Sequence, residues 1–278
     1  MTGTSDRPRP GRAHDRGPDF VQSLERGLAV IRAFGPESPE LTLTEVAKAT
    51  GLTRAAARRF LLTLVELGYV RNDGRSFALR PRVLELGYAY LSGLSITDVA
   101  QPHVEDLVAR IHESSSISVL DGHDVVYVVR VPTKRIMTVA ISVGTRFPAY
   151  CTSMGRVLLA FQSDEEIDRY LTEVELRPLT RQTVVAPEAL RALLRGVCSQ
   201  GYALVDQEME DGLRSIAVPV RDPSGAVVAA MNVSGHSHRV SIAEMTGEFL
   251  PLLRQAAARI EDDLFAQGSR RDGSDPGR

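Results

Sequence analysis

The sequence predicts an α+β fold with two domains joined by a linker helix. Two observations lead to this prediction. Apolar residues recur about every 3.6 positions through most of the first third of the chain, and a short hairpin signal ends that stretch. Farther on, runs with the alternation typical of β-strands form two groups, within residues 116–143 and 203–234, and helical stretches lie around them.

Composition indicates a globular chain whose charge is unevenly distributed. The 278 residues carry a formal net charge of −2, and 43% of them are hydrophobic. Residues 20–94 contain ten Lys and Arg against seven Asp and Glu, whereas residues 95–278 contain 19 against 25. The length suggests two domains. A basic first part and an acidic remainder favour a nucleic-acid-binding domain attached to a sensor domain.

The ends of the chain and its cysteines narrow the class further. No apolar run reaches membrane-spanning length, and residues 1–19 lack the apolar core of a signal peptide. The two cysteines lie 47 positions apart, at Cys151 and Cys198, and make neither a disulfide framework nor a zinc motif. We therefore expect a cytoplasmic protein without a cofactor or metal. The polar segments 1–19 and 268–278 are expected to be disordered tails.

The first helices are predicted from apolar spacing and capping residues. Phe20 to Phe34 keeps helical spacing. Thr42 followed by Glu45 fits a capping box for a second, short helix, which ends near Gly51. Thr53 is expected to cap a third helix. The core-facing residues of this third helix have a helical period and are Ala57, Phe60, Leu61, Leu64 and Leu67.

A hairpin follows the third helix and completes a winged helix-turn-helix. Tyr69–Arg71 and Ser76–Leu79 flank the turn residues Asn72-Asp73-Gly74, and Asp-Gly is a strong hairpin signal. Seven arginines lie between positions 53 and 82, against two acidic residues. This arrangement predicts double-stranded DNA as a partner, with arginines reaching phosphates or guanine edges and small residues permitting close approach to the groove. The candidate DNA-binding residues are Thr53, Arg54, Ala55, Arg58, Arg59, Arg71 and Arg75.

The remaining elements alternate between helices and strands. Further helices are predicted over residues 81–91, 97–112, 154–161, 164–171, 188–199 and 241–265. Strands are predicted over residues 116–120, 125–130, 137–143, 203–205, 216–221 and 227–234. A mostly antiparallel sheet with helices on its faces is comparable to the small-molecule sensor domains of the GAF and PAS class.

Several motifs in this order resemble the IclR family of bacterial transcriptional regulators. The resemblance covers about residues 20–266 and rests on "SLERGLAVIRAF", "LTLTEVAKATGLTRAAARRFLLTLVELGYV", "FALRPRVLELGYAYL", "VGTRFPAYCTSMGRVLLA" and "GYALVDQEMEDGLRSIAVPVRDPSGAVVAAMNVSG". The wording of the last two segments is most similar to the branch that controls protocatechuate and β-ketoadipate catabolism. The resemblance implies a winged helix-turn-helix domain at 20–80, a linker helix at 81–95 and a GAF-like effector-binding domain at 96–267. It also implies a dimer, or a dimer of dimers, that binds a palindromic operator.

The resemblance also implies an effector pocket for a small organic acid. Backbone amides in the turn at Ser153 and Met154 would bind the acid group, as expected for a helix N-terminus, unless this turn is only a structural cap. Polar side chains at Ser215, Asn232 and Ser234 would line the pocket, unless they are simply polar residues at the sheet edge. Asn232 and Ser234 alternate on one strand and so share a face. The family's apolar lining positions correspond to Ile136, Val139 and Phe147.

Two departures from the family pattern bear on the effector. A pocket aspartate is typical after "GYA", but this chain has Val205 there and Asp206 one residue later, which in a strand turns the side chain to the other face. Asp206 remains a candidate ligand, although its side chain is expected on the strand face opposite to that of Val205. Ser215 stands where a cysteine is common. Both changes favour an aromatic or dicarboxylic acid over a two-carbon acid, and the nearby cations are Arg130, Arg135 and Arg146.

The sequence leaves other functions open. One alternative is a regulator that responds to a metal or to a glyoxylate-type acid, and His236 with His238 could supply part of a metal site. Another is an enzyme-like domain fused to a DNA reader, with Cys151 as a nucleophile. Neither Cys151, Ser153 nor Ser215 lies in a nucleophile-elbow motif, so we expect a ligand-responsive transcription factor rather than an enzyme.

Overall fold

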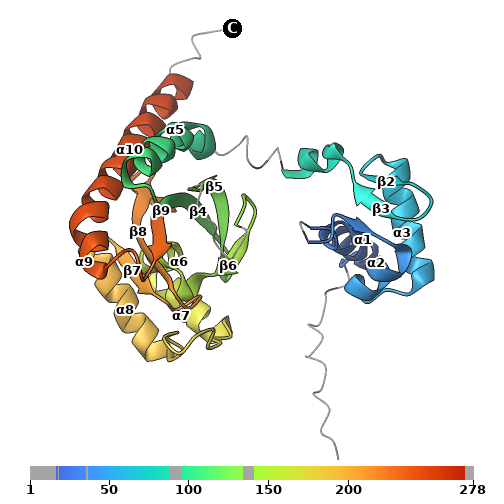
Figure 1. The fold of residues 1–278 in the computed structure, drawn as a ribbon, viewed down its shortest axis with the longest axis horizontal. Helices are drawn as coiled ribbons and strands as arrows, with labels where there is room; N and C mark the ends of the chain where they lie inside the picture. The colour runs from blue at the N-terminus through green and yellow to red at the C-terminus, as the bar shows by residue number, and fades with distance from the viewer. Residues whose placement is uncertain are drawn as a thin grey trace, which may run out of the picture. The chain divides into compact units, whose positions relative to one another are not determined.

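The computed structural model describes residues 17, 19–35, 37–87, 90, 95–133 and 141–272. The chain divides into two compact units, Met1–Ala89 and Tyr90–Arg278 (Figure 1). Each unit has its own hydrophobic core. Among the described helices, none combines the length and the apolar character that a membrane crossing requires.

The first unit contains the three predicted helices, and the second and third start at the predicted capping residues Thr42 and Thr53. They are α1 (Gln22–Arg32), α2 (Leu43–Thr50) and α3 (Arg54–Glu66). The Thr42 side chain accepts from the Glu45 amide while the Glu45 carboxylate accepts from the Thr42 amide, so the predicted capping box is present. α1 is shorter than the predicted 20–34. The helices share one core, formed mainly by Val30, Val46, Ala57, Leu61 and Leu64.

A small antiparallel sheet completes this unit as the predicted wing. The order is β1–β3–β2, with β1 (Glu40–Leu41), β2 (Val70–Asn72) and β3 (Phe77–Leu79). β1 was not predicted, because two residues are too few for an alternation pattern. The unit then enters a 3-10 turn at Pro81–Leu84, where a helix over 81–91 was predicted. Residues 85–87 are helical, and residues 88–89 and 91–94 of the predicted linker lie outside the described residues.

The second unit is built on one antiparallel sheet, as predicted. Within the described residues the sheet has six strands in the order β6–β5–β4–β9–β8–β7. The strands are β4 (Ser114–Asp121), β5 (Asp124–Val131), β6 (Arg146–Pro148), β7 (Ala203–Asp206), β8 (Leu213–Arg221) and β9 (Val227–His236). The pairing of β4 with β9 brings two distant segments together and sets Ser116 opposite Asn232.

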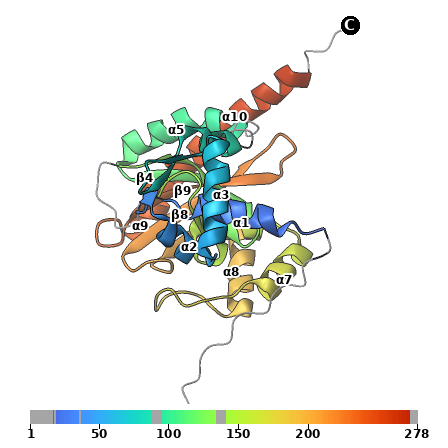
Figure 2. The same cartoon turned by 90° about the vertical axis from the view of Figure 1, so that its right-hand side faces the viewer.

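Helices cover both faces of this sheet. α5 (Ser95–Ile111) and α10 (Leu250–Asp272) lie side by side over one face, as Figures 1 and 2 both show. The 3-10 turn η2 (Ala149–Cys151), α6 (Ser153–Ala160), α7 (Asp164–Glu173) and α8 (Pro187–Gln200) belong to the core of the other face. Residues alternate between the two cores along each strand. On β8, for example, Ile216 packs under α10 and Ala217 packs under α6.

Two predicted elements of the second unit also differ from the structure. Most of the predicted strand 137–143 lies outside the described residues, and its last residues, 141–143, form no strand because Gly144, with a φ of +88°, turns the chain. β6 is the edge strand instead. The predicted helix 241–265 is three segments: α9 (Ile242–Glu244), a π-helical turn η3 (Met245–Phe249) and α10.

The position of the C-terminal tail also needs correction. A disordered tail was expected from residue 268, but α10 continues to Asp272. Extending an existing helix adds one hydrogen bond for each residue fixed, so the Gly268-Ser269 pair does not stop it. Residues 273–278, like residues 1–16 and 18 of the predicted N-terminal tail, lie outside the described residues.

Candidate functional site

The turn between α2 and α3 sets the orientation of the third helix. Gly51 has a left-handed φ of +67° and ends α2, a conformation that glycine adopts without strain. Thr53 begins α3, and its hydroxyl accepts from the amide of Ala56 at 3.2 Å. The chain therefore reverses between the two helices over residues 51–53, as in a helix-turn-helix.

One face of α3 is exposed and carries cationic and small side chains. Thr53, Arg54, Ala55, Arg58 and Arg59 are exposed because Ala57, Leu61 and Leu64 occupy the core-facing positions. The three arginines take part in no ion pair with the described residues of the unit, whose ion pairs join Arg71 to Glu40 and Arg82 to Glu85. Their guanidinium groups are therefore available to an external anion.

The wing carries the other two predicted DNA-binding residues, and they differ. Arg75 is exposed at the turn of the hairpin, where the Asp73 carboxylate accepts from the amides of Arg75 at 2.9 Å and Ser76 at 2.7 Å. These backbone hydrogen bonds lower the pKa of Asp73 to about 2. Arg71 instead forms an ion pair with Glu40 across the wing sheet. Part of the charge of Arg71 is thus balanced within the protein.

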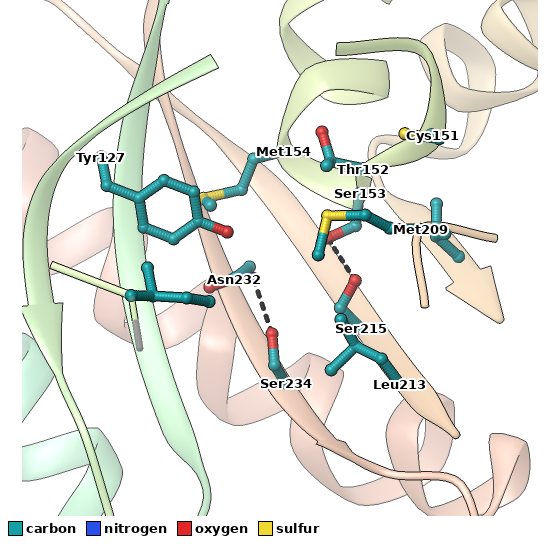
Figure 3. Close-up of a pocket in the computed structure, with 12 residues that line it drawn as sticks. Tyr127, Cys151, Thr152, Ser153, Met154, Met209, Leu213, Ser215, Asn232 and Ser234 are labelled. Atoms are coloured by element: carbon teal, nitrogen blue, oxygen red, sulfur yellow. Dashed lines mark hydrogen bonds between the residues drawn. The ribbon is translucent and has the colours of Figure 1, made fainter. Parts of the chain in front are cut away.

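The second unit contains a cavity between the start of α6 and the sheet (Figure 3). Five of the predicted effector residues line it together: Ser153, Met154, Ser215, Asn232 and Ser234. They come from α6, β8 and β9. These elements are far apart in the sequence, and only the family resemblance predicted that they share a pocket. Seven further residues line the cavity and were not predicted: Tyr127, Ile141, Cys151, Thr152, Val205, Met209 and Leu213.

The start of α6 presents free backbone donors to this cavity. Thr152 caps the helix, since its hydroxyl accepts from the Gly155 amide at 3.1 Å and its carbonyl accepts from the Arg156 amide at 3.0 Å. The amides of Ser153 and Met154, the first two of the helix, make no backbone or side-chain hydrogen bond with the described residues. Free amides at a helix N-terminus favour an anion.

Close packing fixes the position of this helix start. A Cβ atom added to Gly155 would lie 2.2 Å from the Ala149 carbonyl oxygen, so α6 and the preceding turn are in direct backbone contact. A buried ion pair holds the next residue. Nη2 of Arg156 lies 2.5 Å from Oε2 of Glu208, and the two side chains are only 4% and 9% exposed. Glu208 precedes Met209, which lines the cavity, so the ion pair links α6 to the loop that carries Met209.

Neutral hydrogen bonds fix the polar side chains of the cavity. Ser215 donates to Ser153 at 2.9 Å, and the Asn232 amide donates to Ser234 at 2.9 Å (Figure 3). The Asn232 carbonyl oxygen accepts from the Ser116 amide at 3.1 Å. The Ser118 hydroxyl donates to the sulfur of Met154 at 3.3 Å, which holds that thioether over the cavity. These lining residues are uncharged, and the hydrogen bonds between them hold their side chains in place.

Tyr127 forms the wall of the cavity on β5. It is 5% exposed, and its ring packs edge-to-face against Phe147 with ring centroids 5.7 Å apart. Burial raises the pKa of Tyr127 to about 12. The alternation of β5 could have suggested that Tyr127 shares a face with Val125, since both belong to the core under α6. Met209 lies in a loop, where no sequence pattern indicates a pocket position.

Two predicted effector residues, Asp206 and Phe147, do not line the cavity. Val205 lines the cavity, whereas Asp206 lies on the opposite face of β7 and forms an ion pair with Arg214, with 2.8 Å between Oδ1 and Nε. The period-two alternation of the strand explains this, and the prediction that Asp206 lines the pocket is corrected accordingly. The Phe147 ring packs edge-to-face against the Tyr127 ring. Ile136 and Val139 lie outside the described residues.

The three candidate cations differ in their surroundings. Arg146 forms ion pairs with Asp121 and Asp124 at the exposed end of β5 and is not among the lining residues. Arg130 is half-buried and donates to the Ser116 hydroxyl at 3.1 Å, and burial lowers its pKa. Arg135 lies outside the described residues.

The residues considered for metal or nucleophilic chemistry have other environments. The His236 and His238 rings stack with centroids 5.1 Å apart, and no group of three potential ligands gathers among the described residues. Burial raises the pKa of Cys151 to about 12. The thiol is therefore protonated at neutral pH and is a poor nucleophile, because the thiolate is the reactive form.

Comparison with known proteins gives consistent matches along the chain. Residues 23–74 match the IclR helix-turn-helix domain, and residues 88–262 match the domain described as bacterial transcriptional regulator IclR C-terminal. The Pca regulon regulatory protein of Pseudomonas putida is 46% identical over 249 residues, which span 89% of this chain and 86% of the relative.

Two solved structures are similar in fold and sequence. A putative transcriptional regulator, RHA06195 from Rhodococcus sp. RHA1, superposes with a TM-score of 0.79 at 55% identity over 89% of this chain and 99% of that chain. An IclR homolog from Microbacterium hydrocarbonoxydans, complexed with 4-hydroxybenzoate, also has a TM-score of 0.79, at 28% identity over 88% of this chain and 100% of that chain.

Proposed function

The chain belongs to the IclR family of bacterial transcriptional regulators, and on that premise we propose a function for each of its two units. The chain is a DNA-binding regulator that responds to an aromatic acid, and it is not an enzyme. In this proposal a domain over residues 20–80 reads the operator. A domain over residues 96–267 binds the effector, and residues 81–95 link them.

The observation that carries the effector site is the pair of free amides at Ser153 and Met154. Both face the cavity and belong to the first turn of α6, where the helix dipole favours negative charge. The hydroxyls of Ser153 and Ser215 lie beside them. These groups support binding of a carboxylate at this end of the cavity.

The rest of the cavity supports an aromatic body rather than a two-carbon acid. Met154, Met209, Leu213 and Val205 supply apolar surface, and thioethers make favourable contacts with rings. The relative from Microbacterium hydrocarbonoxydans is complexed with 4-hydroxybenzoate, a molecule with the expected acid and ring.

On DNA, α3 would enter the major groove with its exposed face. Arg58 and Arg59 would contact guanine edges or phosphates, and Ala55 would allow close approach. Thr53 and Arg54 at the helix start and Arg75 at the wing would contact the phosphate backbone. Arg71 would contribute less than Arg75 because Glu40 already neutralises part of its charge.

The exposed apolar residues of the first unit support assembly with a second copy. Val21, Leu24 and Leu28 of the α1 segment are 59%, 63% and 48% exposed, and Leu84 and Leu86 are 72% and 53% exposed. Apolar side chains grouped in this way are typical of an interface. We propose a dimer, or a dimer of dimers, on a palindromic operator, because a symmetric protein matches two symmetric half-sites. Such a regulator acts in the cytoplasm, where bacterial DNA lies.

A thermal-shift series on the full chain tests the effector assignment. The acids are protocatechuate, 4-hydroxybenzoate, β-ketoadipate, cis,cis-muconate and glyoxylate. An acid present at 100 times its Kd stabilises the folded protein by about 2.7 kcal/mol. We expect at least one aromatic acid to raise Tm by several degrees and glyoxylate to leave it unchanged. A shift with glyoxylate alone would favour the two-carbon-acid alternative, and no shift with any aromatic acid would remove the assignment.

A further inference from the structure

Tyr127 carries the unpaired hydroxyl of the cavity lining. The side chain is 5% exposed, its residue lines the cavity, and its hydroxyl makes no hydrogen bond with the described residues. Figure 3 shows the phenol extending from β5 into the cavity, toward the side where Ser153 and Ser215 are bonded to each other. The hydroxyl oxygen keeps some exposure to the cavity, so a ligand group can reach it and form a hydrogen bond.

The other polar side chains around Tyr127 are already engaged. Ser153 is bonded to Ser215, and Asn232 is bonded to both Ser234 and the Ser116 amide. The ring of Tyr127 is fixed independently by its edge-to-face contact with Phe147. Packing therefore accounts for the ring but not for the hydroxyl, since a phenylalanine would make the same ring contact.

The protonation state of Tyr127 suits a neutral partner. Burial raises its pKa to about 12, so the hydroxyl is protonated at neutral pH and can both donate and accept. A negatively charged group of a ligand would instead bind at the free amides of Ser153 and Met154. The cavity thus has an anion-binding end on α6 and a neutral hydroxyl on β5.

We propose that Tyr127 is a specificity-determining residue that selects aromatic acids bearing a ring hydroxyl. This inference rests on the proposed function. With the carboxylate at the start of α6, the ring lies between the Met154 and Met209 side chains. The ring hydroxyl then exchanges a hydrogen bond with the Tyr127 hydroxyl. An acid without that hydroxyl would cover the Tyr127 hydroxyl and leave it unpaired, and a site built to bond a hydroxyl rejects the analogue that lacks it.

The test compares Tyr127→Phe with the full-length wild-type protein by titration calorimetry. The ligands are benzoate, 3-hydroxybenzoate, 4-hydroxybenzoate and protocatechuate. For wild type we expect at least one hydroxylated acid to bind about tenfold tighter than benzoate. In Tyr127→Phe that advantage should fall to about twofold or less, while benzoate binds as well as before.

Tyr202→Phe is the matched control. It also removes one phenolic hydroxyl, but Tyr202 immediately precedes β7 and does not line the cavity, and Arg254 lies 5.7 Å from its ring centroid. This variant should keep the wild-type preference. The Tm of each variant without ligand checks that the fold is retained.

The outcomes separate the two proposals. If wild type binds hydroxylated acids preferentially and Tyr127→Phe keeps the preference, the role of Tyr127 is wrong and the proposed function stands. Equal losses for benzoate and the hydroxylated acids would show a packing role and would also overturn this inference. If wild type binds none of the four acids, the proposed function fails and the inference fails with it.

Discussion

The hydroxyl oxygens of Ser153 and Ser215 lie 2.9 Å apart and join the first turn of α6 to the sheet strand β8. Both side chains are buried, at 1% and 8% exposure. This hydrogen bond sits beside the free amides that would hold the effector carboxylate. It therefore ties the anion-binding end of the cavity to the sheet.

Ser215→Ala should weaken effector binding without loosening the fold. Removing the donor frees the Ser153 hydroxyl to rotate. Because a neutral hydrogen bond contributes about 1 kcal/mol, the Kd of the aromatic acid should rise about three- to tenfold. Titration calorimetry measures this change. Ser199→Ala, on the exposed side of α8, is the control and should bind the acid as wild type does. An unchanged Kd in Ser215→Ala would separate this bond from effector binding.

Gly155→Ala should disrupt the start of α6. The added methyl group would lie 2.2 Å from the Ala149 carbonyl oxygen, which is backbone and cannot rotate away. We expect a loss of stability of at least about 2 kcal/mol and a loss of effector binding. Gly196→Ala is the matched control, because nothing lies within 4 Å of the added carbon on α8. It should stabilise the protein by about 0.5–1 kcal/mol. Equal melting temperatures for the two variants would contradict the packing described.

Glu208→Gln should destabilise the second unit strongly. The substitution leaves Arg156 buried without a countercharge, and breaking a buried pair costs about 3–5 kcal/mol. Calorimetric melting should show Tm lowered by roughly 10 °C. Glu175→Gln breaks a pair with Arg177 in which both side chains are exposed, and it should leave Tm nearly unchanged. Similar effects in both variants would show that burial does not set the strength of the pair.

The two cysteines should differ in reactivity. Cys198 is exposed, whereas Cys151 is buried and burial raises its pKa to about 12. A raised pKa keeps the thiol protonated until the pH approaches that value, so Cys151 stays unreactive from pH 7 to pH 9. A thiol reagent should label one cysteine in the folded wild type and none in folded Cys198→Ser. Rapid labelling of two cysteines in the folded protein would contradict this.

Local signals in the sequence predicted the first unit well. Thr42, Glu45, Gly51 and Thr53 act through neighbours three or four positions away, so their roles can be inferred from spacing. The ion pair between Arg71 and Glu40 could not, because it depends on β1, a two-residue strand formed only by pairing with β3.

The cavity was only partly predictable. Ser153, Met154, Ser215, Asn232 and Ser234 came from the family resemblance, and the structure brings them together. Tyr127 was missed, because strand alternation shows which residues share a face but not what covers that face. Met209 was missed because it lies in a loop held by the buried pair of Arg156 and Glu208, which lie 52 positions apart in sequence.

The most direct test of the two-unit account measures DNA and effector binding on one variant. Arg58→Ala combined with Arg59→Ala removes two exposed cations of α3. The duplex is one that the wild-type protein selects from a randomised library, and Arg71→Ala, whose cation is paired with Glu40, serves for comparison. We expect the double variant to lose at least about tenfold in affinity for the duplex. The slope of log affinity against log salt concentration should fall by the amount expected for about two phosphate contacts per subunit. The Kd of the double variant for the aromatic acid should stay within about twofold of wild type. Unchanged affinity for the duplex, or an equal loss of duplex and acid binding, would contradict the account.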